Sequence, residues 1–147
     1  AKHFEAELKR KIDTRFVESF DQWKIQYNLL QKEVDMILIG DMNAVQLDGY
    51  THEEIEQFVL ENTYTPTGHW DTWLNTIALL TLATVPEEQG EYAAKTALRI
   101  LDGTAPHLIP LVHNKRAKIF LNMPLAKKLG IKFPMALIEN AHLISAK

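Results

Sequence analysis

Residues 90–134 read GEYAAKTALRILDGTAPHLIPLVHNKRAKIFLNMPLAKKLGIKFP, and their pattern decides the fold class. They continue a helix predicted to open at Pro86 and to close before Gly103, because proline suits a first helical turn and glycine suits a helix exit. Two strands are predicted next, LIPLVH (108–113) and AKIFLN (117–122). Asn122 then caps a short helix that ends at Gly130. This alternation predicts an α/β fold: a three-layer, mostly parallel sheet flanked by helices.

The N-terminal half continues the alternation. Ser19 with Gln22, and Thr51 with Glu54, have the spacing of capping boxes and predict helices from residue 20 and from residue 52. Three strands are expected in this half and just beyond it: IDTRFVES (12–19), VDMILIG (34–40) and the end of DTWLNTIALLTLATV (71–85). The continuous apolar run in VDMILIG predicts a strand covered on both faces.

Composition limits the classes of function. The 147 residues suit one domain, 1–147, and the formal net charge of −3 provides no positive field for nucleic acid. The chain has no cysteine, which excludes disulfides and thiolate chemistry. Phosphate-binding glycine motifs, the serine elbow of hydrolases and the His-Glu-x-x-His zinc pattern are absent from the sequence. We therefore predict no enzyme, no cofactor and no metal site.

The stretch quoted above resembles the C-terminal part of the ABC-transporter substrate-binding family, which has the type I periplasmic binding protein fold. The family pattern is a Gly-x-x-Ala-Ala helix ending in Ile-Leu-x-Gly, an Ile-Pro strand, a strand closing on Asn, and then Ala-x-x-Leu-Gly-Ile and a proline. The matching positions are Gly90, Ala93, Ala94, Ile100, Leu101, Gly103, Ile109, Pro110, Asn122, Ala126, Leu129, Gly130, Ile131 and Pro134.

The resemblance covers about the second half of such a protein and implies that this chain is a C-terminal lobe, with the N-terminal lobe absent. In the family the Gly-x-x-Ala-Ala helix packs on the first lobe. The helix predicted over 86–102 is then expected to expose its alanine face, and an exposed apolar face favours a homodimer or an exchange between protomers.

Ligands of open α/β sheets bind outside the carboxyl ends of the strands. Polar and aromatic residues follow the predicted strands in this chain, and Ser19 adds a hydroxyl at a helix start. The predicted ligand-binding set is Asp41, Asn43, Thr67, Gly68, His69, Trp70 and Ser19. The strand that ends at Asp41 resembles the family strand that ends in an Asp-Asn pair, with Met42 inserted between Asp41 and Asn43.

Four members of this set have a purely structural alternative. His69 suits a hydrogen-bonded loop histidine, Asp41 a turn cap, and Ser19 an ordinary helix cap. Trp70 suits either the cleft or the core. Trp73, three residues on, is expected in the core or an interface, and its removal is expected to cost more stability than removal of Trp70.

The resemblance implies an extracytoplasmic solute-binding component of an ABC-type uptake system. It would be periplasmic or otherwise extracytoplasmic in the full-length protein, and would bind a small molecule, such as an amino acid, between two lobes. Its partners would be that ligand and an ABC permease or a signalling protein. The alternatives are a ligand-sensing domain of a signalling or transcriptional regulator, and a cytoplasmic α/β enzyme.

Overall fold

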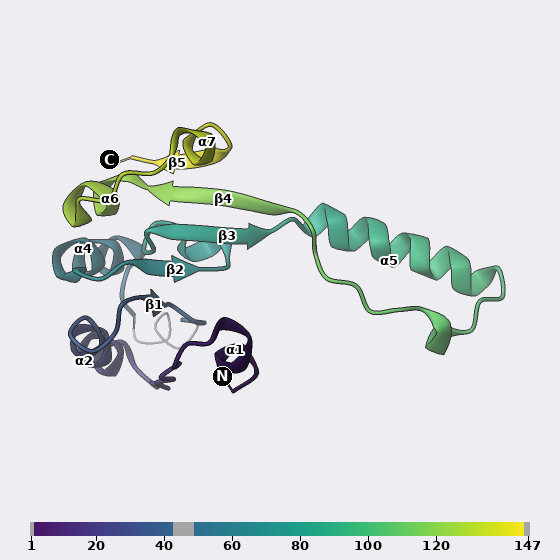
Figure 1. Ribbon diagram of the computed structural model, residues 1–147, viewed down its shortest axis with the longest axis horizontal. Coiled ribbons are helices and arrows are strands. Elements are labelled where there is room, and N and C mark those ends of the chain that lie inside the picture. The colour runs from purple at the N-terminus through teal and green to yellow at the C-terminus, as the bar shows by residue number, and fades with distance from the viewer. Residues whose placement is uncertain (1, 43–48, 146–147) are drawn as a thin grey trace.

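The computed structural model describes residues 2–42 and 49–145, and a five-stranded sheet runs through it (Figure 1). The strands in spatial order are β1 (Ile37–Leu38), β2 (Thr67–His69), β3 (Leu80–Thr84), β4 (Ala117–Asn122) and β5 (Ala141–Ile144). The pairs β1–β2, β2–β3 and β4–β5 are parallel, and β3–β4 is antiparallel. The predicted α/β class with a mostly parallel sheet is confirmed.

Helices follow the capping signals closely. The α-helices are α1 (Lys2–Leu8), α2 (Phe20–Leu30), α4 (His52–Asn62), α5 (Pro86–Leu101), α6 (Met123–Leu129) and α7 (Met135–Ile138), with 3-10 turns η1 (Thr72–Leu74) and η2 (Pro106–Leu108). At the start of α4, Thr51 Oγ1 accepts from the Glu54 amide at 3.2 Å, and the Thr51 amide donates to the Glu54 carboxylate at 2.8 Å. This is the reciprocal capping box that the sequence predicts.

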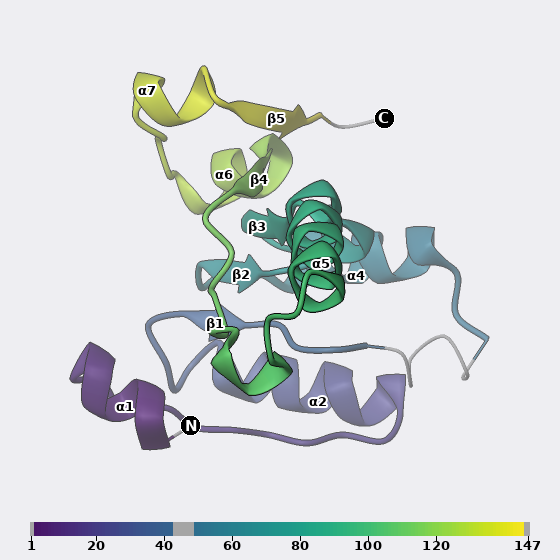
Figure 2. The ribbon, with the colours of Figure 1, turned by 90° about the vertical axis from the view of Figure 1, so that its right-hand side faces the viewer.

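The hydrophobic core lies between α2, α4 and one face of the sheet. Figure 2 shows α4 beside the sheet and α2 beneath its β1 edge. Ile37 and Ile39 are buried against Ile55 and Val59 of α4. The Tyr27 hydroxyl of α2 and Thr63 Oγ1, just after α4, lie 2.6 Å apart and join the two helices inside this core.

The opposite face of the sheet is open at its β1 side. Met36, Leu38 and Leu82 are 55%, 64% and 49% exposed. Gly68 lies beside Met36 and Leu38, since a Cβ there would approach the Met36 methyl group to 2.9 Å and Leu38 Cδ1 to 3.4 Å. The expectation that VDMILIG is covered on both faces is therefore wrong: its β1 residues alternate between buried and exposed.

The C-terminal part of the quoted stretch forms as predicted. β4 spans Ala117–Asn122, the Asn122 side chain accepts from the Leu125 amide at 3.0 Å, and α6 ends at Gly130. Gly130 has a φ of 66°, the left-handed conformation that favours glycine at a helix exit. The sequence reading missed β5, which pairs in register with β4.

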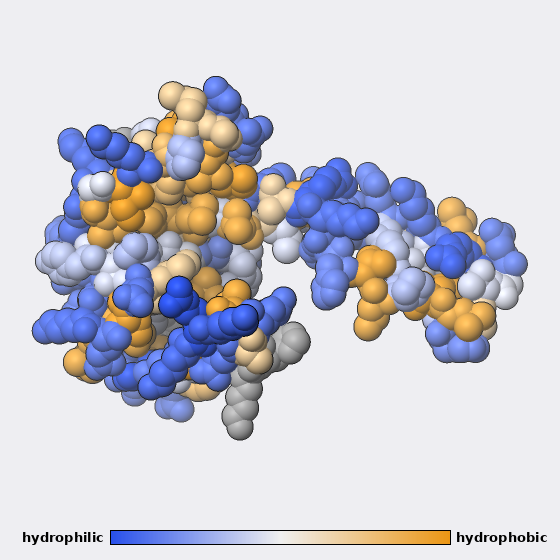
Figure 3. Space-filling view, in the orientation of Figure 1, coloured by the Kyte–Doolittle hydropathy of each residue, from blue (hydrophilic) through white to orange (hydrophobic). Residues whose placement is uncertain are grey.

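Residues 86–116 leave the sheet as an arm that contains α5 and η2 (Figure 1). None of the residues of α5 is buried, and Leu98, Leu101 and Leu111 are largely exposed. Figure 3 shows apolar patches along this arm. Within the arm, the Tyr92 hydroxyl donates to the Pro110 carbonyl at 2.6 Å, so the returning segment is tied to the helix. The predicted exposure of the helix over 86–102 is confirmed.

Two predicted strands do not form. Residues 12–17 and 109–116 have no regular structure, although strands were predicted over 12–19 and 108–113. A strand forms only where a neighbouring strand supplies hydrogen-bond partners, and the described sheet offers none to either segment.

Candidate functional site

The carboxyl ends of β1 and β2 lie side by side and form the candidate ligand site. The Ile39 amide donates to the Gly68 carbonyl at 2.9 Å, which extends the β1–β2 pairing one residue beyond the end of β1. Gly40 and Asp41 follow β1, and Trp70 follows β2, so all three lie just beyond the carboxyl ends of these two parallel strands. The structure therefore brings together part of the predicted set: Asp41, His69 and Trp70.

His69 is the buried member of this group, with 5% of its surface exposed. Its Nδ1 lies 2.9 Å from the Ile39 carbonyl oxygen. A carbonyl only accepts, so Nδ1 carries a proton and donates it to this bond. Among the described residues, Nε2 has no hydrogen-bond partner, and neither does the buried hydroxyl of Thr81, the register neighbour of His69 on β3.

Trp70 is the aromatic member on the surface, with 48% of its surface accessible. Its ring stacks on the His69 imidazole, with centroids 5.4 Å apart and planes 28° apart. The indole also lies over Gly40, because a Cβ at that position would be 3.7 Å from Trp70 Cη2. One part of the indole is thus supported by the ends of two strands, and the rest is open for contact.

Trp73 lies in η1 and is 40% exposed. Its amide is held by the Asp71 carboxylate at 3.3 Å, and its ring approaches His52 edge-on with centroids 6.2 Å apart. Of the two placements expected for Trp73, the core is wrong, and an interface stays a prediction. The side chain that η1 buries is Leu74. The 3-10 turn therefore leaves Trp73, like Trp70 just before it, half-exposed.

Thr67 and Gly68 are held inside the sheet. Thr67 Oγ1 accepts from the Leu79 amide at 2.9 Å, and both groups are buried. Gly68 makes room for Met36 and Leu38, as described above. Ser19 caps α2 by accepting from the Gln22 amide at 3.2 Å. These contacts give all three residues structural roles, and their contact with a ligand stays a prediction. Asn43 lies outside the described residues.

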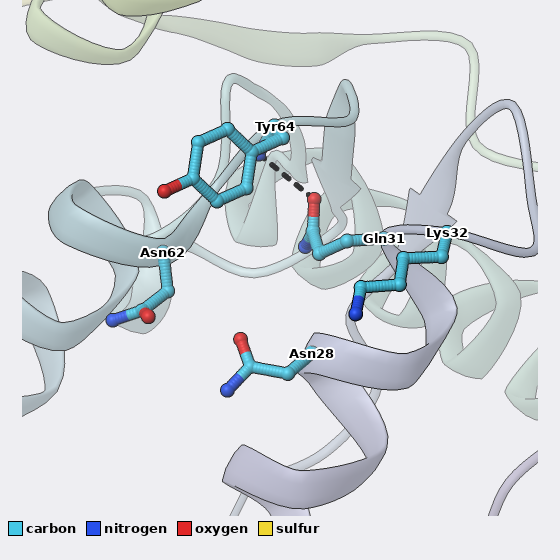
Figure 4. A pocket seen from close by; sticks show the side chains of 5 residues that line it. All are labelled: Asn28, Gln31, Lys32, Asn62 and Tyr64. Carbon is cyan, nitrogen blue, oxygen red and sulfur yellow. Dashed lines mark hydrogen bonds between the residues drawn. The ribbon is translucent and has the colours of Figure 1, made fainter.

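Two hollows of the surface are lined by residues other than those at the ends of β1 and β2. One, of about 470 Å³, lies between the ends of α2 and α4 and is lined by Asn28, Gln31, Lys32, Asn62 and Tyr64 (Figure 4). Within it, the Tyr64 amide donates to Gln31 Oε1 at 2.9 Å. The other, of about 550 Å³, lies on the arm between α5 and residues 112–115. Neither of these two hollows includes a residue of the predicted set, and the half-exposed Trp70 ring at the ends of β1 and β2 is an open wall that lines neither of them.

Other kinds of site find little support in the part of the chain that the structure describes. No group of three or more His, Asp or Glu side chains there is placed to hold a metal ion. No helix within residues 2–42 or 49–145 has the length and apolar character needed to cross a bilayer.

Comparison with protein families gives a match over nearly the whole chain. A family model described as ABC transporter substrate binding protein matches residues 14–144. That range includes β1, β2 and the arm formed by residues 86–116. A comparison with curated proteins found no match.

Solved structures of similar fold come from three bacteria. A ligand-free, open substrate-binding protein with adhesive properties from Clostridium difficile has a TM-score of 0.66 at 18% identity, covering 99% of this chain and 48% of that one. An ABC domain in complex with L-Trp from Streptococcus pneumoniae has a TM-score of 0.63 at 18% identity, covering 97% and 48%. A conserved domain protein from Vibrio cholerae has 0.61 at 20% identity, covering 97% and 47%. The chain therefore spans about half the length of these relatives, and the likeness shows the fold.

Proposed function

We propose that this chain is one lobe of a solute receptor and binds a small molecule at the carboxyl ends of β1 and β2. The proposal proceeds from the finding that the chain belongs to the ABC transporter substrate-binding protein family. The observation that carries this proposal is the Trp70 indole, half-exposed at that edge and supported from behind by buried His69. An exposed aromatic face beside polar groups is the usual composition of a small-molecule site.

The proposed ligand class is amino acids, with an aromatic amino acid as the first candidate. The Trp70 face would stack on an aromatic side chain. Asp41, exposed at the end of the neighbouring strand, would accept hydrogen bonds from an ammonium group. The L-Trp complex of the Streptococcus pneumoniae structure supports this choice by analogy of fold.

Binding would proceed without covalent chemistry. In the proposed receptor a second lobe supplies the opposite wall of the cleft, and closure of the two lobes excludes water from the ligand. The receptor would act outside the cytoplasm and deliver its ligand to an ABC permease or a signalling partner. The open form of the single wall described above fits a site that needs a second wall.

The arm would supply the contact to a second copy of this chain or to the other lobe of the receptor. Leu98, Leu101 and Leu111 expose apolar surface there that water solvates poorly. We propose that, when this chain stands alone, the arms of two copies pack together as a homodimer. In the two-lobed receptor the same surface would pack on the other lobe.

A thermal-shift screen against the common amino acids tests the ligand class. A ligand at a hundred times its dissociation constant adds about 2.7 kcal/mol to the free energy of unfolding. We expect L-tryptophan or L-tyrosine to raise the melting temperature, and L-alanine, which has no ring to stack, to have a smaller effect. Equal shifts for alanine and the aromatic amino acids would remove Trp70 stacking as the basis of binding.

Light scattering over a concentration series tests the dimer. We expect the mass to rise toward twice 16.9 kDa and to return to the monomer value in Leu98→Glu/Leu101→Glu. Gln89→Glu is the control, since it adds a negative charge to an exposed position on the polar side of the same helix. A monomeric wild type at high concentration would contradict the dimer and leave the ligand proposal untouched.

A further inference from the structure

We propose that His69 is a positioning residue, which holds the Trp70 indole in place as a preformed wall of the ligand site. The inference rests on the proposed function for the identity of that site. Its structural part concerns the free protein, and can therefore be tested without any ligand.

The His69 imidazole is held in place by its own contacts within the sheet. His69 is 5% exposed, and its Nδ1–H donates to the Ile39 carbonyl at 2.9 Å. This bond ties the last residue of β2 to the residue that follows β1, in addition to the backbone bond between Ile39 and Gly68. A buried ring with one bonded nitrogen has little freedom to rotate, so its plane is set by the sheet.

The indole rests on two supports that come from different strands. One is the His69 ring, at a centroid distance of 5.4 Å with planes 28° apart, which is within the range of stacked aromatic pairs. The other is Gly40, where the absence of a side chain leaves the backbone open to Trp70 Cη2. A side chain larger than alanine at position 40 would push the indole away.

Holding the indole in advance would strengthen binding. A half-exposed tryptophan without supports would sample several rotamers, and a ligand would have to order it. His69 reduces that cost although its own buried ring need not touch the ligand. Loss of the support should weaken binding about two- to tenfold, the range that corresponds to ordering one side chain.

The experiment uses Trp23→Phe/Trp73→Phe as background, so that Trp70 is the only tryptophan and reports its own motion. Time-resolved fluorescence anisotropy is measured on the free protein for His69→Asn and His69→Phe. Asparagine keeps a donor near the Ile39 carbonyl but removes the ring, and phenylalanine keeps the ring but removes the donor. His142→Asn is the control, because His142 lies on β5, at the opposite edge of the sheet from β1, and stacks on Phe120 with centroids 5.0 Å apart.

We expect His69→Asn to add a fast component to the Trp70 anisotropy decay, His69→Phe to add less of it, and His142→Asn to add none. Unchanged decay in a folded His69→Asn protein would overturn the proposal. If that variant does not fold, His69→Gln, which also lacks the ring, takes its place with the same expectation.

Calorimetry with L-tryptophan on the same variants separates this inference from the proposed function. A faster Trp70 decay with two- to tenfold weaker binding supports both. Faster decay with unchanged affinity overturns His69 as a positioning residue for binding. Absence of binding by the wild type counts against the proposed ligand, while the anisotropy result still decides whether His69 holds Trp70.

Discussion

Tyr27 and Thr63 form the buried hydroxyl pair of the core, and burial raises the pKa of Tyr27 above its ordinary value of 10.0. In the unfolded chain Tyr27 ionises near 10.0, whereas in the folded protein it ionises only at higher pH. The unfolded state therefore binds fewer protons above pH 10, and the free energy of unfolding falls as the pH rises from there.

Replacing Tyr27 by phenylalanine should remove this alkaline loss and should cost about 1 kcal/mol at pH 7 through the lost hydrogen bond. Urea unfolding at pH 7 and at several values above 10 measures both effects. Tyr64→Phe is the control, since Tyr64 is 71% exposed. A wild type and a Tyr27→Phe variant with parallel pH profiles would contradict the burial effect.

Thr67 gives a second test at the scale of one residue. Thr67→Val keeps the volume but leaves the buried Leu79 amide without its acceptor, so we expect a loss of about 1 to 3 kcal/mol. Thr84→Val, at an exposed position of β3, should change the free energy of unfolding by less than about 0.5 kcal/mol. Comparable melting temperatures for the two variants would show that the Thr67 hydroxyl is not needed by the fold.

Single-residue predictions from the sequence succeeded where the signal is local. The caps at Ser19, Thr51 and Asn122 involve partners three residues away, so the sequence displays both members. The support of Trp70 by His69 could not be predicted in the same way. It depends on Ile39, thirty residues from His69, and only the pairing of β1 with β2 brings the two together.

At the scale of an element, Glu88 holds the arm in shape. Its carboxylate accepts from the Lys115 and Arg116 amides, both at 2.9 Å, and these bonds lower the pKa of Glu88 below its ordinary value of 4.5. The contacts are complete above 4.5 and are lost as the pH falls through the lowered folded-state pKa.

We therefore expect Glu88→Ala to remove the hydrogen-exchange protection of the Lys115 and Arg116 amides at pH 6. The same two amides should lose protection in the wild type when the solution is acidified below the lowered pKa of Glu88. Glu87→Ala, on the same exposed helical turn, is the control. Protection that persists in Glu88→Ala would mean that residues 109–116 are held by other contacts.

The elements that were mispredicted share one cause. IDTRFVES alternates as strands do and LIPLVH is a short apolar run, but such a pattern does not state which neighbour supplies the hydrogen bonds. β5 was missed for the opposite reason. Its four residues, AHLI, are too short to show a period, and pairing with β4 defines them.

At the scale of the whole molecule, the described residues form an open wall at Trp70 and an extended arm over residues 86–116, and these are the two surfaces for which we propose functions. The order of the elements predicted over residues 90–134 was enough to predict the fold class. The sequence alone could not distinguish Trp70 from Trp73 as the ring of the candidate site, because the two residues lie three positions apart in the same segment. In the structure both side chains are half-exposed. Only the support beneath Trp70 separates them.

The central claim is that ligand binds at the carboxyl ends of β1 and β2, and a titration of the ¹⁵N-labelled protein with L-tryptophan tests it most directly. We predict that the amide signals of Gly40, Asp41, His69 and Trp70 move together, and that Trp70→Ala abolishes those shifts while Trp73→Ala retains them. Shifts concentrated instead at Asn28, Gln31 and Tyr64 would place the ligand in the hollow between α2 and α4 and would contradict the claim.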